Sequence, residues 1–81
     1  MNMDQSVCTA SLSSQTYALK AQKALANAAI MSRVVRLDAS KSKKGCSYGI
    51  EFSCGHLHNV ENILRQKNIR IRALYSGDTE L

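Results

Sequence analysis

Hydrophobic and polar residues alternate with a period of two in several short segments, which predicts β-strands. The clearest segment is 46–54, where Tyr48, Ile50 and Phe52 share one face and the residues between them are polar or glycine. Gly55 ends this segment. Three weaker strand patterns occupy residues 7–12, 31–37 and 69–75. The last of them predicts inward side chains at Ile69, Ile71, Ala73 and Tyr75.

Two other segments repeat hydrophobic residues every three or four positions, which predicts amphipathic helices. Residues 15–29 are rich in alanine, and Ser13 or Ser14 can cap their first turn by accepting a backbone N–H. The predicted buried stripe of this helix is Ala18, Ala21, Leu25 and Ala28. A second helix follows a cap at Asn59 and closes at Asn68, which tolerates the left-handed conformation. Its apolar side consists of Val60, Ile63 and Leu64.

The resulting order of elements is β-α-β-β-α-β, the split βαβ order of the ferredoxin-like sandwich. We therefore predict an α+β fold, with a four-stranded antiparallel sheet and two helices on one of its faces. The chain of 81 residues corresponds to a single domain, 1–81, in which residues 1–5 and 77–81 are frayed tails. Because this architecture hosts many functions, the function has to be argued from individual side chains.

An excess of basic residues favours anionic partners. Eleven Lys and Arg oppose six Asp and Glu, which gives a formal charge of +5. Four arginines fall in predicted strands and could line a phosphate-binding surface: Arg33, Arg36, Arg70 and Arg72. RNA binding on a sheet face also needs exposed aromatic rings, and the predicted parity turns Tyr48, Phe52 and Tyr75 inward. We therefore interpret the arginines as a solvated face and do not expect nucleic acid as a partner.

The start of the chain lacks the pattern of a targeting signal. Residues 1–6 are polar and include Asp4, in place of a basic stretch followed by an apolar run. No apolar run approaches the roughly 20 residues that a membrane-spanning helix needs. We expect a cytoplasmic protein with no membrane partner, whose three cysteines are reduced.

Cys46 is the strongest candidate for chemistry. It lies between Gly45 and Ser47 at the start of the third predicted strand, directly after a lysine-rich loop. Nearby ammonium groups favour the thiolate, the nucleophilic form of cysteine, and can steer an anionic donor. The lysines of this loop are Lys41, Lys43 and Lys44. Gly45 and Gly49 would let a ligand approach the backbone closely. The alternative is that Cys46 only continues the inward face of its strand, whose parity it shares.

Several features of the chain together resemble the selenium/sulfur carrier-like family of small bacterial domains. The matching features are Ser13-Ser14 before the alanine-rich helix, Ile30 before the basic second strand, the segment from Gly45 to Phe52, and the closing Ile71-Arg72-Ala73-Leu74-Tyr75. Family members typically have a cysteine at the start of the third strand, which falls on Cys46. The resemblance implies that this thiol carries sulfur or selenium as a persulfide or selenopersulfide. It also implies donor and acceptor proteins as partners.

Two features depart from the family pattern. Many members have a glycine after the first helix, where this chain has Ala29. Many also have a proline in the loop before the cysteine, and this chain contains no proline. The departures concern the geometry of the loop and the choice of partner, whereas the cysteine itself is retained.

Cys54, His56 and His58 form a second group of potential ligands. A structural zinc site needs four ligands, and Cys46 lies eight residues before Cys54, roughly 26 Å away in a regular strand. We therefore interpret the group as a strand end, a turn and a helix start, and expect no metal and no other cofactor. Cys8 is predicted to be a small core residue of the first strand. The pairing of the cysteines stays open at this point.

No catalytic set for hydrolysis, phosphate-binding loop or dinucleotide motif is present in the sequence. Two hypotheses remain. In the first, Cys46 accepts a chalcogen and passes it on, as a carrier rather than as an enzyme with its own turnover. In the second, the protein is a regulatory or interaction module that uses the open sheet face, as a dimer or on nucleic acid. A reactive thiol at Cys46 distinguishes the two hypotheses.

Overall fold

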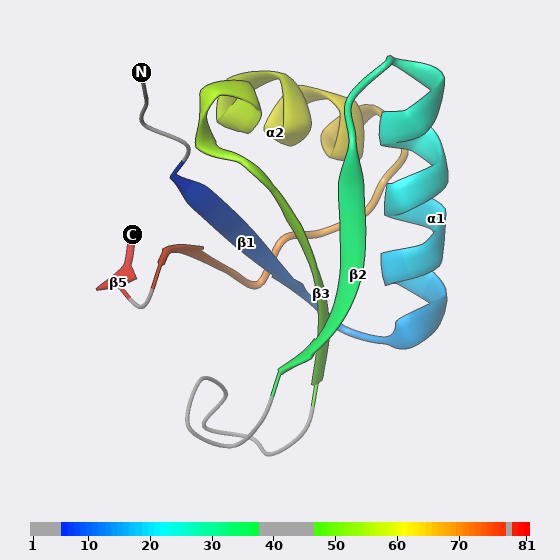
Figure 1. The fold of residues 1–81 in the computed structure, drawn as a ribbon. Coiled ribbons are helices and arrows are strands. Elements are labelled where there is room, and N and C mark those ends of the chain that lie inside the picture. The colour runs from blue at the N-terminus through cyan, green and yellow to red at the C-terminus, as the bar shows by residue number, and fades with distance from the viewer. Residues whose placement is uncertain (1–5, 38–46, 78) are drawn as a thin grey trace.

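The computed structural model describes residues 6–37, 47–77 and 79–81. Its elements are β1 (Val7–Leu12), α1 (Gln15–Asn27), β2 (Ser32–Leu37), β3 (Ser47–Ser53), the 3₁₀ turn η1 (Cys54–His56), α2 (Leu57–Gln66), β4 (Ala73–Ser76) and β5 (Thr79–Glu80). The sheet order is β2-β3-β1-β4-β5, and all neighbouring strands are antiparallel. Both helices cover the same face of the sheet (Figure 1). The predicted ferredoxin-like sandwich is confirmed.

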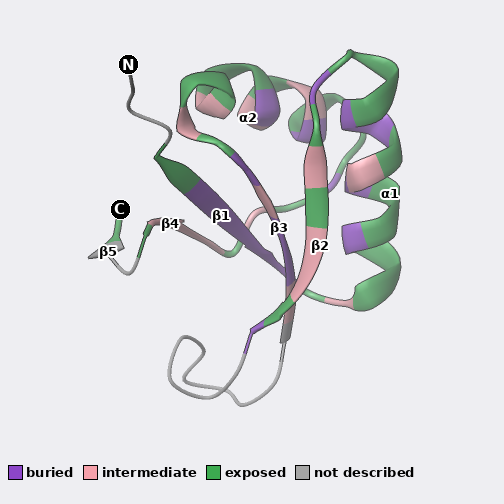
Figure 2. Cartoon of the chain, in the orientation of Figure 1, coloured by how far each residue is buried: buried purple, intermediate pink, exposed green. Residues whose placement is uncertain are grey.

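The core lies between the two central strands and the helices (Figure 2). Ala10 and Leu12 of β1 and Ile50 of β3 are fully buried on the face that the helices cover. Val60 and Leu64 of α2 pack into the same cluster. The predicted inward alternation of β3 is therefore confirmed, and burial of these side chains is what holds the helices on the sheet.

Helix α1 begins as the sequence predicts. The side chain of Ser14 accepts a hydrogen bond from the backbone N–H of Tyr17 at 3.2 Å, which caps the first turn. The buried residues of the helix are Ala18, Ala21, Ala24 and Leu25. The small alanine side chains let α1 approach the sheet closely. Ala28, a predicted member of this stripe, is exposed because the helix has already ended at Asn27.

Both helices end in the same backbone motif. After α1, the N–H of Ile30 donates to the carbonyl of Leu25 at 2.8 Å, and Ala29 between them has a φ of 62°. After α2, the N–H of Ile69 donates to the carbonyl of Leu64 at 2.9 Å, and Asn68 has a φ of 60°. These are Schellman closures, in which the residue with positive φ is usually glycine. The predicted left-handed closure at Asn68 is confirmed.

The start of α2 differs from the prediction. The 3₁₀ turn η1 follows β3 directly, and α2 begins at Leu57 rather than after a cap at Asn59. The position before the helix is His56, whose side chain makes no capping hydrogen bond. The 3₁₀ turn leads directly into the helix, since the N–H of Leu57 donates to the carbonyl of Cys54.

The last long strand also differs from the prediction. Residues 69–72 run as an irregular segment, and only Ala73–Ser76 form β4. Leu74 lies opposite Ala10 and packs against the core, whereas Tyr75 lies opposite Thr9 on the face that no helix covers. The predicted inward placement of Ala73 and Tyr75 is therefore wrong. The alternation counted from Ile69 does not continue into β4, because residues 69–72 are not in a strand and do not alternate between two faces.

The C-terminal residues are not the frayed tail that the sequence suggests. Thr79–Glu80 form the short strand β5, which pairs with β4. The N–H of Leu81 donates to the carbonyl of Leu74 at 2.8 Å. A turn at Gly77, with a φ of 61°, allows the chain to fold back on β4.

We predict that Ala29→Gly raises the free energy of unfolding by about 1 kcal/mol, because glycine adopts a positive φ without the steric penalty that alanine has there. The matched control is Ala26→Gly, at an exposed position inside α1. This substitution should lower the free energy of unfolding by about 1 kcal/mol. Urea unfolding of both variants measures the two changes. Changes of the same sign in both variants would contradict the assigned closure.

Candidate functional site

The residues predicted to carry the chemistry precede β3 in the sequence, except for Gly49, which belongs to β3. Cys46 lies outside the described residues, as do Gly45 and the three lysines, Lys41, Lys43 and Lys44. The description resumes at Ser47, which follows Cys46 directly and pairs with Leu37 of β2. Tyr48, the next residue, pairs with Leu12 at the end of β1. β3 is therefore paired with β2 from Ser47 onward and with β1 from Tyr48 onward.

Gly49 is the one predicted site residue that the structure describes, and it has a clear structural role. It is buried in β3, opposite Ser11 of β1 and Val35 of β2. A Cβ atom at this position would overlap the carbonyl oxygen of Ala10 and lie 3.4 Å from Leu37 Cδ1. Glycine is thus required for the close approach of β1 to β3. Its predicted role in admitting a ligand to Cys46 stays a prediction.

Cys8 and Cys54 form a disulfide. Cys8 is 1% exposed in β1, as expected for a core residue, but its sulfur is bonded to that of Cys54 in the turn η1. The backbone supports the bridge, since the N–H of Cys54 donates to the carbonyl of Ser6 at 3.0 Å. The prediction that all three cysteines are reduced is therefore wrong for this pair. The two residues are 46 apart in sequence, and the antiparallel register of β1 and β3 brings them together.

The disulfide closes a long loop and so constrains the unfolded chain. For a separation of 46 residues, loop-closure entropy predicts a stabilisation of about 4 kcal/mol. This is a large fraction of the roughly 5–15 kcal/mol by which a small domain is usually stable. The bridge therefore compensates for the thin core of a short chain.

The third cysteine lies at the other end of β3 in the sequence. Cys54 directly follows the last residue of β3, and Cys46 directly precedes the first. The strand from Ser47 to Ser53 spans roughly 20 Å at about 3.3 Å per residue. Because a disulfide uses one sulfur from each partner, Cys46 is the only cysteine of the chain outside this bridge.

The arginines do not form the single surface that could bind phosphates. Arg33 and Arg36 lie on opposite faces of β2, because they are an odd number of positions, three, apart in a strand. Arg33 forms an ion pair with Glu51 of β3 at 2.7 Å on the uncovered face. Arg70 and Arg72 are exposed in the irregular segment before β4.

The histidine-containing segment does not assemble a metal site in the described part of the chain. Cys54 has its sulfur in the disulfide and cannot act as a thiolate ligand in this state. His56 and His58 are exposed. Across residues 6–37, 47–77 and 79–81, no group of three or more His, Cys, Asp or Glu side chains is arranged to hold a metal ion.

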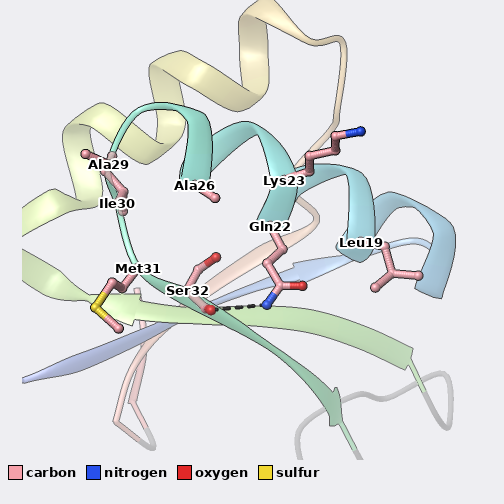
Figure 3. A pocket seen from close by; sticks show the side chains of 8 residues that line it. All are labelled: Leu19, Gln22, Lys23, Ala26, Ala29, Ile30, Met31 and Ser32. Carbon is pink, nitrogen blue, oxygen red and sulfur yellow. Dashed lines mark hydrogen bonds between the residues drawn. The ribbon is translucent and has the colours of Figure 1, made fainter.

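A groove of about 500 Å³ lies between α1 and the start of β2 (Figure 3). Gln22 bridges it, since its Nε2 donates to the backbone carbonyl of Ser32 at 3.3 Å. Leu19 and Met31 are exposed along its rim. The groove is lined by none of the residues predicted to act with Cys46.

A family model described as "Putative Se/S carrier protein-like" matches residues 8–76. The chain belongs to this family. The match includes Cys46 and all of the described strands except β5 and the first residue of β1, and the suspected family is confirmed. No curated protein and no solved structure matches the chain.

From its family, we expect the Se/S carrier-like domain to have donor and acceptor partners in general. In the described part of the domain, neither helix has the length and apolar character needed to cross a bilayer.

We predict that Gly49→Ala lowers the free energy of unfolding by several kcal/mol, because the added methyl group meets backbone atoms that cannot move without opening the sheet. Gly55→Ala is the matched control. A Cβ there would have only Ser53 Oγ nearby, at 3.7 Å, so the variant should stay within about 0.5 kcal/mol of the wild type. Thermal or urea unfolding measures both. Equal losses in the two variants would show that β1 and β3 are not in the close contact described.

Proposed function

We propose that the domain is a carrier in which the thiol of Cys46 accepts sulfur or selenium and delivers it to an acceptor protein. The observation that carries the proposal is the disulfide between Cys8 and Cys54. While it is closed, this bridge occupies two of the three cysteines and leaves Cys46, which lies within the residues that the family model matches, as the remaining thiol. A carrier needs only one available thiol, which suits a domain of this size.

The transfer requires no redox cofactor. The Cys46 thiolate attacks the terminal sulfur of a persulfide on the donor, a new S–S bond forms, and the donor cysteine leaves as a thiolate. Cys46 then holds the persulfide, Cys–S–S⁻. In the second half, a nucleophile of the acceptor attacks the terminal sulfur, and Cys46 is regenerated as a thiolate. A selenium atom in the terminal position would follow the same two steps.

The charges around Cys46 in the sequence suit this chemistry. Lys41, Lys43 and Lys44 lie within five residues of Cys46, and their ammonium groups favour both the thiolate and the anionic persulfide. They also attract an anionic donor, with an effect that weakens as salt is added. Gly45 would keep the backbone before the thiol free of a side chain.

The partners in this account are donor and acceptor proteins. We propose that the carrier acts in the cytoplasm and that nucleic acid is not among its ligands. The arginines are divided between two faces of the sheet and an irregular segment, so nucleic-acid binding should be weak and should follow net charge.

An interaction module that uses the uncovered sheet face is the second candidate. One observation favours it, namely that Tyr75 lies on this face rather than in the core. The exposed Val7 lies at the edge of the same face, at the start of β1. Such a module would need no thiol at Cys46, and the experiment below separates the two functions.

We predict that incubation of the domain with a cysteine desulfurase and cysteine places one additional sulfur atom on Cys46, and that Cys46→Ser abolishes the modification. Intact-mass spectrometry followed by peptide mapping measures it. The reason is that Cys46 is the only cysteine outside the disulfide. Modification of the Cys46→Ser variant to the wild-type level, or no modification of the wild type, would contradict the carrier function.

The contribution of the lysine charges to transfer is tested by neutral substitutions. Replacing Lys41, Lys43 and Lys44 by glutamine should slow the transfer several-fold at low salt and less at high salt. The matched control replaces three exposed lysines of the helical layer by glutamine, Lys20, Lys23 and Lys67. The two triple variants therefore have the same net charge. Equal slowing in the two triple variants would show that only the overall charge matters.

A further inference from the structure

The two sulfurs of the Cys8–Cys54 bridge have unequal surroundings. Cys8 is 1% exposed, because β1 lies between β3 and β4, where Phe52 and Ser76 flank Cys8. Cys54 is partly exposed, and its sequence neighbours Ser53 and Gly55 are both exposed. Cys54 also packs against the edge of the core. One end of the bridge is thus fully buried and the other is partly exposed.

We propose that Cys8 and Cys54 form a reversible dithiol–disulfide couple, that its reaction partner is a small thiol of the glutathione type, and that exchange begins at Cys54 Sγ. The couple is a second reactive site, separated from Cys46 in the sequence by the whole of β3 on the side of Cys54. If the protein is cytoplasmic, this behaviour is expected, since disulfides there are mostly transient, catalytic or redox-sensing. The proposal does not depend on the carrier function.

The exchange consists of two displacements. A small thiolate attacks Cys54 Sγ, a mixed disulfide forms at Cys54, and the Cys8 sulfur leaves as a thiolate that takes up a proton. A second small thiolate attacks the sulfur of the bound small thiol, and Cys54 leaves. The net reaction reduces the bridge to two thiols and oxidises two small thiols to their disulfide. The reverse reaction, driven by the small disulfide, restores the bridge.

Ser76 is placed to assist this exchange. Its Oγ lies 3.9 Å from Cys54 Sγ, within the range of a hydrogen bond to sulfur. A hydroxyl that donates to the Cys54 thiolate would favour its departure in the second displacement. Ser76, the last residue of β4, is therefore a positioning residue for the couple.

Opening of the bridge would loosen one corner of the sheet. The start of β1, the end of β3 and the end of β4 meet there, and the bridge is the covalent link between β1 and the turn η1. Besides the strand pairing, this corner keeps backbone hydrogen bonds from Cys54 N–H to Ser6 and from Gly77 N–H to Val7. Reduction should therefore speed amide hydrogen exchange at residues 54 and 77 more than at the buried centre of β3.

The first test uses full-length Cys46→Ser protein with the native bridge intact. Reduced glutathione is added without denaturant, the reaction is quenched with acid at early times, and peptide mapping locates the mixed disulfide. The proposal predicts glutathione on Cys54 and almost none on Cys8. It also predicts the same final ratio of bridge to dithiol whether the reaction starts from the oxidised or the reduced protein.

Two outcomes would overturn the proposal. Glutathione found mainly on Cys8 would reverse the assigned order of attack. A bridge that resists glutathione until denaturant is added would be a permanent structural link rather than a redox couple.

The second test uses a matched pair of variants in the same background, Cys8→Ala and Cys54→Ala. With oxidised glutathione, the remaining Cys54 thiol should react at least about tenfold faster than the remaining Cys8 thiol, because Cys54 is partly exposed and Cys8 is buried. In the Cys8→Ala variant, Ser76→Ala should shift the pH profile of this reaction upward, a change that loss of packing alone would not produce. A similar rate for Cys8 and Cys54 in variants that remain folded by circular dichroism would contradict the proposal.

Discussion

β3 is paired with β1 on one side and with β2 on the other, and the close approach of β1 allows only glycine at position 49. This double pairing fixes the strand in position and in register. It directs Tyr48, Ile50 and Phe52 toward the helices and Glu51 toward the uncovered face, where Glu51 meets Arg33. The hydrophobic core and the surface ion pair thus depend on the same register.

The same strand separates two kinds of sulfur chemistry. Its C-terminal end leads into Cys54, which the sheet register brings to Cys8. Its N-terminal end directly follows Cys46 in the sequence. The bridge stabilises a domain with a small core and, in the proposed carrier, while closed it leaves Cys46 as the thiol for transfer. In this account, a structural constraint on the sheet also determines which thiol is available.

The strongest sequence signals were local. The alternation in β3, the Ser14 cap and the closure at Asn68 each depend on a few neighbouring residues, and all three are confirmed. The parity of β4 was mispredicted because the irregular segment 69–72 interrupts the alternation. β5 has only two residues, too few to show the hydrophobic periodicity that predicts a strand.

The disulfide could not be predicted for a different reason. Its two cysteines are 46 residues apart, and they meet only because Cys8 pairs with Phe52, two residues before Cys54. Strand register is set by the packing of the whole sheet, which no short segment of sequence contains. By contrast, the positive φ of Ala29 had a sequence signal, since family members often have glycine there. Cys46 itself was identified from its lysine-rich neighbourhood and from the family resemblance, and neither depends on long-range contacts.

The most direct test of the carrier account is the alkylation of native, unreduced protein over a range of pH, with peptide mapping of the label. The account predicts a single labelled residue, Cys46, with a rate that rises as the thiolate forms, and no label in Cys46→Ser. After reduction and denaturation, all three cysteines should be labelled. Label on Cys8 or Cys54 before reduction, or a Cys46 that stays inert in the native protein, would contradict the account.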